Sequence, residues 1–120
     1  MVKVRNFTPH PITIIVRKGE NMQEHTDITL PSEGNARVSV TEKMVSTVDS
    51  GQGLVDYYVE EFGQVEGLPD PEPNTVLIVS RLVYDACPDR DDLVYPVGLL
   101  RDELGRVIGC RGLSLPRSLR

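Results

Sequence analysis

A continuous run of β-branched and aliphatic residues at 75–79 constrains the fold more than any other segment. A short apolar run without alternation is typical of a strand that is buried on both faces. The proline-rich connector 69–74 precedes it and cannot enter the interior of a helix or strand. Ser80 follows as a helix N-cap, and residues 81–87 make about two helical turns before Pro88. The sequence therefore predicts a buried strand that leads directly into a short helix.

Most other apolar segments are short and alternate with polar residues, as half-buried strands do. The predicted strands are 2–5, 12–16, 28–32, 36–41, 54–62, 75–79, 93–95, 96–100 and 106–115. Polar loops are expected at 17–27 and, within the poorly legible stretch 42–53, a mobile loop at 46–53, with a hairpin turn at 102–105. The fold class is therefore α+β: one domain over 1–120, a mainly antiparallel sheet, one or two short helices, and a flexible tail at 116–120.

Composition limits the partners and the compartment. A chain of 120 residues fits one domain, and its net charge of −5 disfavours DNA and RNA polymers without excluding a small anion. The first residues alternate like a strand and lack the apolar core of a signal peptide, and no segment has the length of a membrane span. We expect a cytoplasmic protein that contacts neither membrane nor nucleic acid.

No arrangement of residues matches a known catalytic or metal motif. Neither His10 nor His25 lies near a Cys, Asp or Glu at the spacing typical of metal ligands. Cys87 and Cys110 match neither a zinc pattern nor a disulfide framework. Cys110 could gain reactivity from Arg111, but no histidine is placed to act as its base. We expect a protein without catalytic residues, metal or cofactor.

Arg111 is the strongest candidate for binding, because it interrupts an apolar strand between Gly109 and Gly112. A buried guanidinium is costly unless it is paired, so it should meet a carboxylate or face a cavity that an anion can fill. The flanking glycines would let a ligand or another backbone come close. A structural ion pair is the alternative interpretation.

Three further segments are candidates. Ser80 and Arg81 stand at the carboxyl end of the buried strand and at a helix N-terminus, where anions are favoured. In the loop 6–11, two prolines hold hydrogen-bonding groups rigidly, and an aromatic ring nearby is available for stacking. Arg101 lies at a charged hairpin end. Each has a plain structural alternative, namely an ordinary N-cap, a β-loop and a solvated turn. The candidate residues of the loop are Asn6, Phe7, Thr8 and His10.

Segments 6–10 (NFTPH), 78–82 (IVSRL) and 101–112 (RDELGRVIGCRG) together resemble a family of phage and prophage proteins. It is the first-described Thoeris anti-defence family, whose members act as sponges for cyclic ADP-ribose signals. The resemblance implies an α/β domain with an antiparallel sheet that assembles as a dimer or a larger homo-oligomer. It also implies a pocket at the subunit interface that binds a cyclic ADP-ribose isomer, and in some members cyclic oligonucleotides, without cleaving it. The essential arginine of the family corresponds to Arg111.

Two other classes of function stay open. The chain could be a structural or interaction protein of a phage or prophage, whose motifs only shape a sheet. An enzyme that acts on nucleotides is the third class. A sponge needs roughly nanomolar affinity, about −12 kcal/mol, to compete with a receptor.

Overall fold

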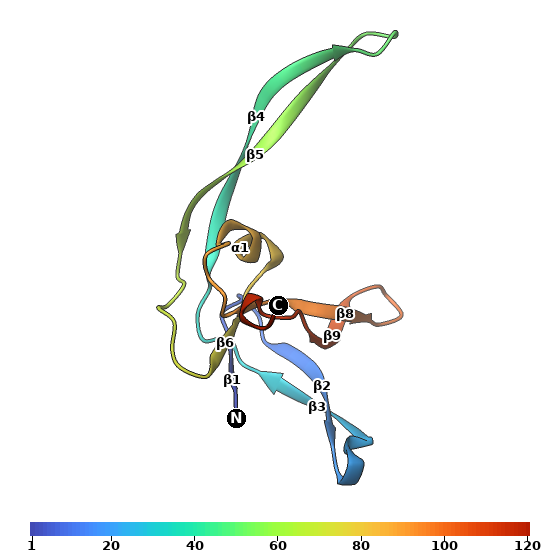
Figure 1. Cartoon of the computed structure of the whole chain (residues 1–120). Helices are drawn as coiled ribbons and strands as arrows, with labels where there is room; N and C mark the ends of the chain where they lie inside the picture. The colour runs from blue at the N-terminus through green and yellow to red at the C-terminus, as the bar shows by residue number, and fades with distance from the viewer.

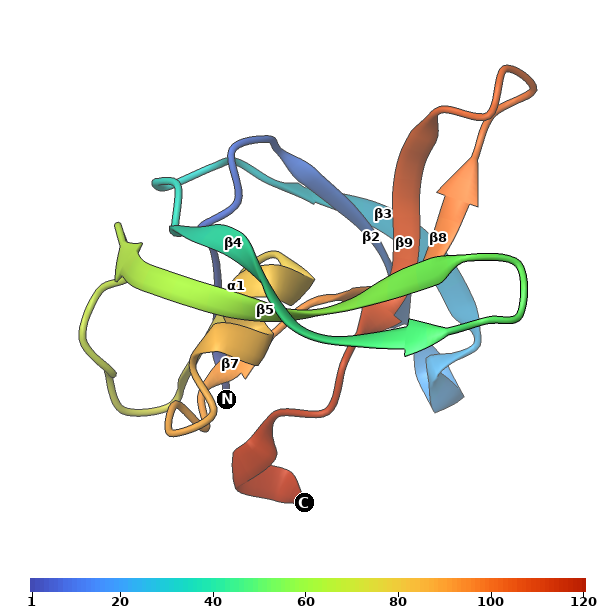
Figure 2. The same ribbon diagram turned by 90° about the horizontal axis from the view of Figure 1, so that it is seen from above.

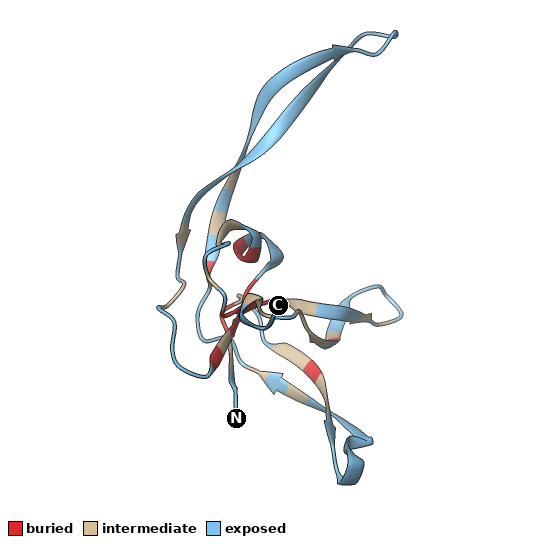
Figure 3. Cartoon of the chain, viewed as in Figure 1, coloured by how far each residue is buried: buried red, intermediate tan, exposed pale blue.

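The computed structural model describes all residues, 1–120, and its centre is a small parallel sheet. β6 (Thr75–Ile78) lies between β1 (Lys3–Asn6) and β7 (Leu93–Val94), and both neighbours run parallel to it. Leu77, Ile78 and Val79 are at most 2% exposed. The predicted buried strand at 75–79 is confirmed, and Figure 3 shows the buried residues gathered around it.

The predicted helix is also confirmed, as α1 (Arg81–Ala86). The hydroxyl of Ser80 accepts a hydrogen bond from the backbone N–H of Val83 at 3.3 Å, so Ser80 is the N-cap. Val83 and Tyr84 turn toward the core and pack with Leu77 and Val79 in the larger of two apolar clusters.

A second, four-stranded sheet has the order β3-β2-β9-β8. Its strands are β2 (Ile12–Lys18), β3 (Glu24–Leu30), β8 (Pro96–Arg101) and β9 (Val107–Leu113). Ile14 of β2 is level with Cys110 of β9, and both pack against Ile78 and Val94 of the parallel sheet. The smaller cluster therefore joins the two sheets, and Figure 2 shows the four strands beside the half of the domain that carries α1.

Two expectations about loops are wrong. The segment 17–27 is not one loop, because β2 continues to Lys18 and β3 begins at Glu24, with only the 3-10 turn η1 (Glu20–Met22) between them. The segment 46–53 is not a mobile loop either, since β4 (Arg37–Asp49) pairs with β5 (Leu54–Glu66) along nearly its whole length. The turn between them is confined to 50–53, where Gly51 and Gly53 adopt positive φ.

The β4–β5 hairpin extends far from the rest of the domain, as the green arm of Figure 1. The molecule measures 62 × 38 × 26 Å, and its radius of gyration of 18.3 Å exceeds the roughly 14 Å typical of a domain this long. We call residues 41–64 the arm, and every one of them is exposed.

The C-terminal segment 116–120, which the sequence predicts to be a flexible tail, contains the 3-10 turn η2 (Arg117–Leu119). The guanidinium of Arg117 donates hydrogen bonds to the carbonyls of Tyr84, Cys87 and Arg90 at 2.9–3.1 Å, and it lies 3.8 Å from the centre of the Tyr84 ring. These carbonyls stand at and beyond the end of α1. Those of Tyr84 and Cys87 already accept backbone N–H groups, so Arg117 adds a second donor to each and joins the C-terminal segment to the helix end.

The predicted fold class is confirmed. The chain forms one α+β domain with mainly antiparallel strands, one short helix and two 3-10 turns. None of the helical segments has the length and apolar character needed to span a bilayer.

Candidate functional site

Arg111 lies on the outer face of the four-stranded sheet. Successive residues of β9 point to opposite faces, so Cys110, which is 1% exposed, faces the core and Arg111 faces outward. Val107 and Ile108, the apolar neighbours that suggested a buried strand, are themselves 51% and 58% exposed. The expectation of a buried guanidinium is therefore wrong, because Arg111 leaves β9 on the face opposite the buried Cys110.

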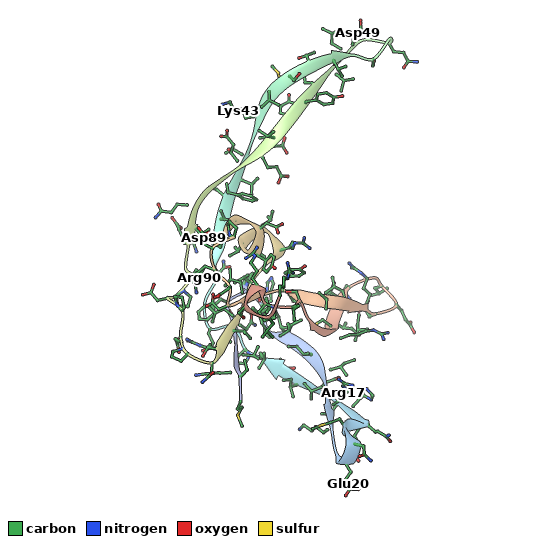
Figure 4. The ribbon with its side chains drawn as sticks, viewed as in Figure 1. Arg17, Glu20, Lys43, Asp49, Asp89 and Arg90 are labelled. Atoms are coloured by element: carbon green, nitrogen blue, oxygen red, sulfur yellow. The ribbon has the colours of Figure 1, made fainter.

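Arg111 nevertheless borders a concavity that two other cationic or hydrogen-bonding side chains share. Its volume is about 470 Å³, and it is lined by Arg111, Arg17, His25 and Ile15. Arg17 of β2 is directly opposite His25 of β3, so their side chains leave the sheet on the same face. Figure 4 places Arg17 near the free end of the β2–β3 hairpin. We call Arg17, His25 and Arg111 the cationic cluster.

The cationic cluster has no acidic partner within the chain. The seven ion pairs of the structure include neither Arg17 nor Arg111. Asp27 pairs with Ile15 across the β2–β3 ladder and so lies on the same face, but its carboxylate is not within 4.0 Å of either guanidinium. The alternative interpretation, a structural ion pair of Arg111, does not describe this structure.

Gly98 of β8 allows the Arg111 side chain to cross the neighbouring strand. A Cβ atom at this position would lie 2.9 Å from Cβ of Arg111 and 3.2 Å from its Cγ and Cδ. Gly98 also has a φ of +65°, which other residues rarely adopt. The glycines that flank Arg111 act differently: Gly109 admits the carbonyl of Thr13, and nothing lies within 4 Å of a Cβ built at Gly112.

A second cavity gathers four of the other candidates. Thr8, His10, Ser80 and Arg81 line a space of about 490 Å³, so loop 6–11 and the start of α1 do come together. Arg81, however, is paired with Asp85 at 3.2 Å and lies over the ring of Tyr95, 4.6 Å from its centre. The hydrogen bond and charge of Asp85 raise the pKa of Arg81 above its ordinary value. The arginine of this cavity therefore has a carboxylate partner, whereas the two arginines of the cationic cluster have none.

Asn6 and Phe7 are parts of the framework. The side chain of Asn6 makes four hydrogen bonds within the chain, two as donor and two as acceptor, and the residue is fully buried. Phe7 is 6% exposed, packs in the larger apolar cluster, and lies beneath the guanidinium of Arg5. These two residues shape loop 6–11, and the structure places neither of them in the cationic cluster.

Arg101 closes the β8–β9 hairpin. Its guanidinium donates to the carbonyl of Gly105 at 2.8 Å, and it lines neither cavity. Next to it, Asp102 accepts hydrogen bonds from the backbone of Arg106 and Leu104, which lower the pKa of this carboxyl below its usual value. The segment has the geometry of a charged turn.

Sequence reasoning missed Arg17 and His25. Both fall within 17–27, whose polar composition favours a loop, and a loop does not place the two residues on neighbouring strands. The signal that could have found them is the alternation of 24–30, in which Ile28 and Leu30 face the core. Extending that strand backward from Ile28 pairs it with β2 and sets His25 opposite Arg17.

The cysteines lie in surroundings that oppose nucleophilic chemistry. Burial raises the pKa of both the Cys110 and the Cys87 thiol, whereas a reactive cysteine needs a lowered pKa. No group of three His, Cys, Asp or Glu side chains in the structure could hold a metal ion.

This environment predicts the reactivity of Cys110. With iodoacetamide at pH 8, Cys110 should be alkylated at least about tenfold more slowly in the folded chain than in urea, because it is buried and its thiolate is disfavoured. Peptide mass spectrometry measures both thiols in one sample, and the half-buried Cys87 is the internal control. Equal rates for Cys110 with and without urea would contradict the expectation.

Comparison with known proteins gave no match to any family model, curated protein or solved structure. The resemblance to the anti-defence sponges thus stays a prediction.

Proposed function

We propose that the protein binds and sequesters a small, phosphate-bearing nucleotide at the cationic cluster without cleaving it. One observation carries the proposal: Arg17, His25 and Arg111 arrive from three strands at one concavity, and neither arginine has a carboxylate partner. Unpaired guanidinium groups that converge are the usual way in which an acidic protein binds a small anion.

The chemistry of the concavity suits a phosphate joined to a larger group. Each guanidinium can donate two parallel hydrogen bonds to a phosphate, and the His25 ring adds a further N–H donor. Ile15 supplies an apolar surface beside these groups. A volume of about 470 Å³ falls within the range of roughly 300–1,000 Å³ common for small-molecule sites.

The ligand we propose is a cyclic ADP-ribose isomer, with cyclic oligonucleotides as possible further ligands. Such molecules carry phosphates that the cluster can bind, and the resemblance to phage anti-defence sponges supports the same class. The protein would then act in the cytoplasm of the host cell as a homodimer or larger homo-oligomer. Binding a ligand without cleaving it needs complementary charge and a concavity of suitable shape, but no catalytic acid and base. The groups that line the concavity are therefore sufficient for the proposed function.

A thermal-shift titration tests this function. Ligand at 100 times its Kd stabilises the folded chain by about 2.7 kcal/mol, which corresponds to a rise in Tm of roughly 10 °C. Cyclic ADP-ribose isomers should produce this rise, and adenosine, which lacks phosphate, should not. Heating the complex should return intact ligand on chromatography. An unchanged Tm with every cyclic nucleotide would refute the proposal, and recovery of a cleaved product would indicate an enzyme.

A structural or interaction protein is the second candidate, and the exposed arm favours it. It predicts self-assembly together with a melting temperature that no cyclic nucleotide changes. The same titration therefore separates the two candidates.

A further inference from the structure

The chain, with its extended arm, exposes more surface than a compact monomer of this mass usually does. The solvent-accessible surface is 8592 Å², about 2,000 Å² above the roughly 6,500 Å² expected for a folded monomer of 13.4 kDa. A two-stranded hairpin with nothing packed on either face is marginally stable in water. Yet β4 and β5 are 13 residues each, and residues 41–64 contact solvent throughout. The excess exceeds the roughly 800 Å² that each partner contributes to a standard interface.

The two faces of the arm differ in charge. Residues of β5 alternate between the faces from Leu54 to Phe62, and their partners on β4 follow the register of the ladder. One face, here the neutral face, carries Thr41, Lys43, Ser46, Val48, Val55, Tyr57, Val59 and Glu61. The other, here the acidic face, has apolar residues as well but interleaves them with four carboxylates; it carries Val40, Glu42, Met44, Thr47, Asp49, Leu54, Asp56, Tyr58, Glu60 and Phe62.

We propose that the neutral face of the arm binds the same face of a second copy of this chain. Val48 and Val55 are directly opposite each other and 38% and 46% exposed, and Tyr57 and Val59 continue the apolar row at 54% and 44%. Burying such a row removes apolar surface from water, which is the main favourable term in association.

The charges on the neutral face identify a second copy as the partner. Lys43 and Glu61 lie on neighbouring strands, with Nζ and Oε1 4.0 Å apart, so the face carries one charge of each sign beside its apolar row. In a two-fold interface, if residue i of one copy contacts residue j of the other, then residue j of the first copy contacts residue i of the second. Lys43 of each copy can therefore lie opposite Glu61 of the other, so a face that carries both charges is complementary to itself. Figure 4 shows Lys43 partway along the arm and Asp49 near its tip.

The acidic face cannot form the same contact. Glu42 is directly opposite Glu60, and like charges in that position repel even within one chain. Two copies joined by this face would bring four such carboxylates together. The dimer therefore uses the neutral face and leaves the acidic one in solvent.

Sedimentation velocity of the full chain between 1 and 200 µM tests the interface, independently of any ligand. We expect a mass of about twice 13.4 kDa for the wild type. The variant V55D/V59D should sediment as a monomer, with dimer affinity lowered at least about 100-fold, because it places charge in the apolar row. The matched control L54D/Y58D adds the same number of carboxylates to the acidic face and should remain a dimer.

A pair of charge variants keeps the test independent of how well the aspartate variants fold. Lys43→Glu should weaken the dimer, and the exchange K43E/E61K should restore it, because the face then carries both signs again. A wild-type monomer up to 200 µM would overturn the proposal and leave the arm to a different partner. Equal loss of the dimer in V55D/V59D and L54D/Y58D, or no recovery on charge exchange, would overturn it as well.

Discussion

Replacing Arg111 with alanine is expected to weaken ligand binding strongly while the fold and the assembly state persist. The guanidinium is one of two in the cationic cluster, and a lost bidentate phosphate contact should lower affinity at least about 30-fold. The side chain makes no hydrogen bond or ion pair within the chain and lies on the exposed face of β9, so its removal leaves no buried group unsatisfied. The measurement is the ligand-induced rise in Tm, compared with the Tm of the free variant.

Arg106→Ala is the matched control for Arg111→Ala, because Arg106 is an exposed arginine beside the same strand whose guanidinium is paired with Asp102. It should bind ligand as the wild type does. Arg111→Lys should recover only part of the affinity, since an ammonium cannot form two parallel hydrogen bonds with a phosphate. If Arg111→Ala failed to fold, or bound ligand as tightly as the wild type, the site would be refuted.

Asn6→Ala should cause the largest loss of stability of any single polar substitution in the chain, about 3–4 kcal/mol. The amide N–H groups of Asn6 donate to the carbonyls of His10 and Leu30, at 2.9 and 3.0 Å. Its carbonyl oxygen accepts from the backbone N–H and the hydroxyl of Thr8, at 2.9 and 2.6 Å. Alanine would remove these four hydrogen bonds in a site where Asn6 itself is fully buried, although the carbonyl of His10 would keep another donor, the hydroxyl of Thr8.

Urea denaturation followed by circular dichroism measures the change for Asn6→Ala. Thr8→Val is the control, because it removes the hydroxyl and keeps the backbone N–H that bonds Asn6, so it should cost only about 1 kcal/mol. A loss below 1 kcal/mol for Asn6→Ala would mean that loop 6–11 does not depend on this amide.

The parts of the fold that follow local rules could be predicted from the sequence. The strand at 75–79 has enough consecutive β-branched and aliphatic residues to indicate burial, and Ser80 and Pro88 mark the two ends of the helix. The arm could not be predicted in the same way. Residues 46–49 are polar except for Val48, and they become a strand only because residues 54–57, beyond the turn, pair with them.

The candidate site could be predicted only in part, because some of its residues are brought together by strand pairing that local patterns do not show. Arg111 was identified because a charge in an apolar strand is unusual, but the face on which it lies depends on the position of the core. Arg17 and His25 meet only through the pairing of β2 with β3, which a loop interpretation hides. Asn6 shows the reverse case: the sequence indicates hydrogen-bonding groups in a rigid loop, and only the structure shows that they bond within the chain.

Isothermal titration of the wild type and of Arg17→Ala with a cyclic ADP-ribose isomer tests the central claim most directly. If strands β2, β3 and β9 build one anion site, the wild type should bind with roughly nanomolar Kd and Arg17→Ala at least about tenfold more weakly, with an unchanged circular dichroism spectrum. No heat of binding up to 100 µM ligand, or equal affinities for the two proteins, would contradict the account.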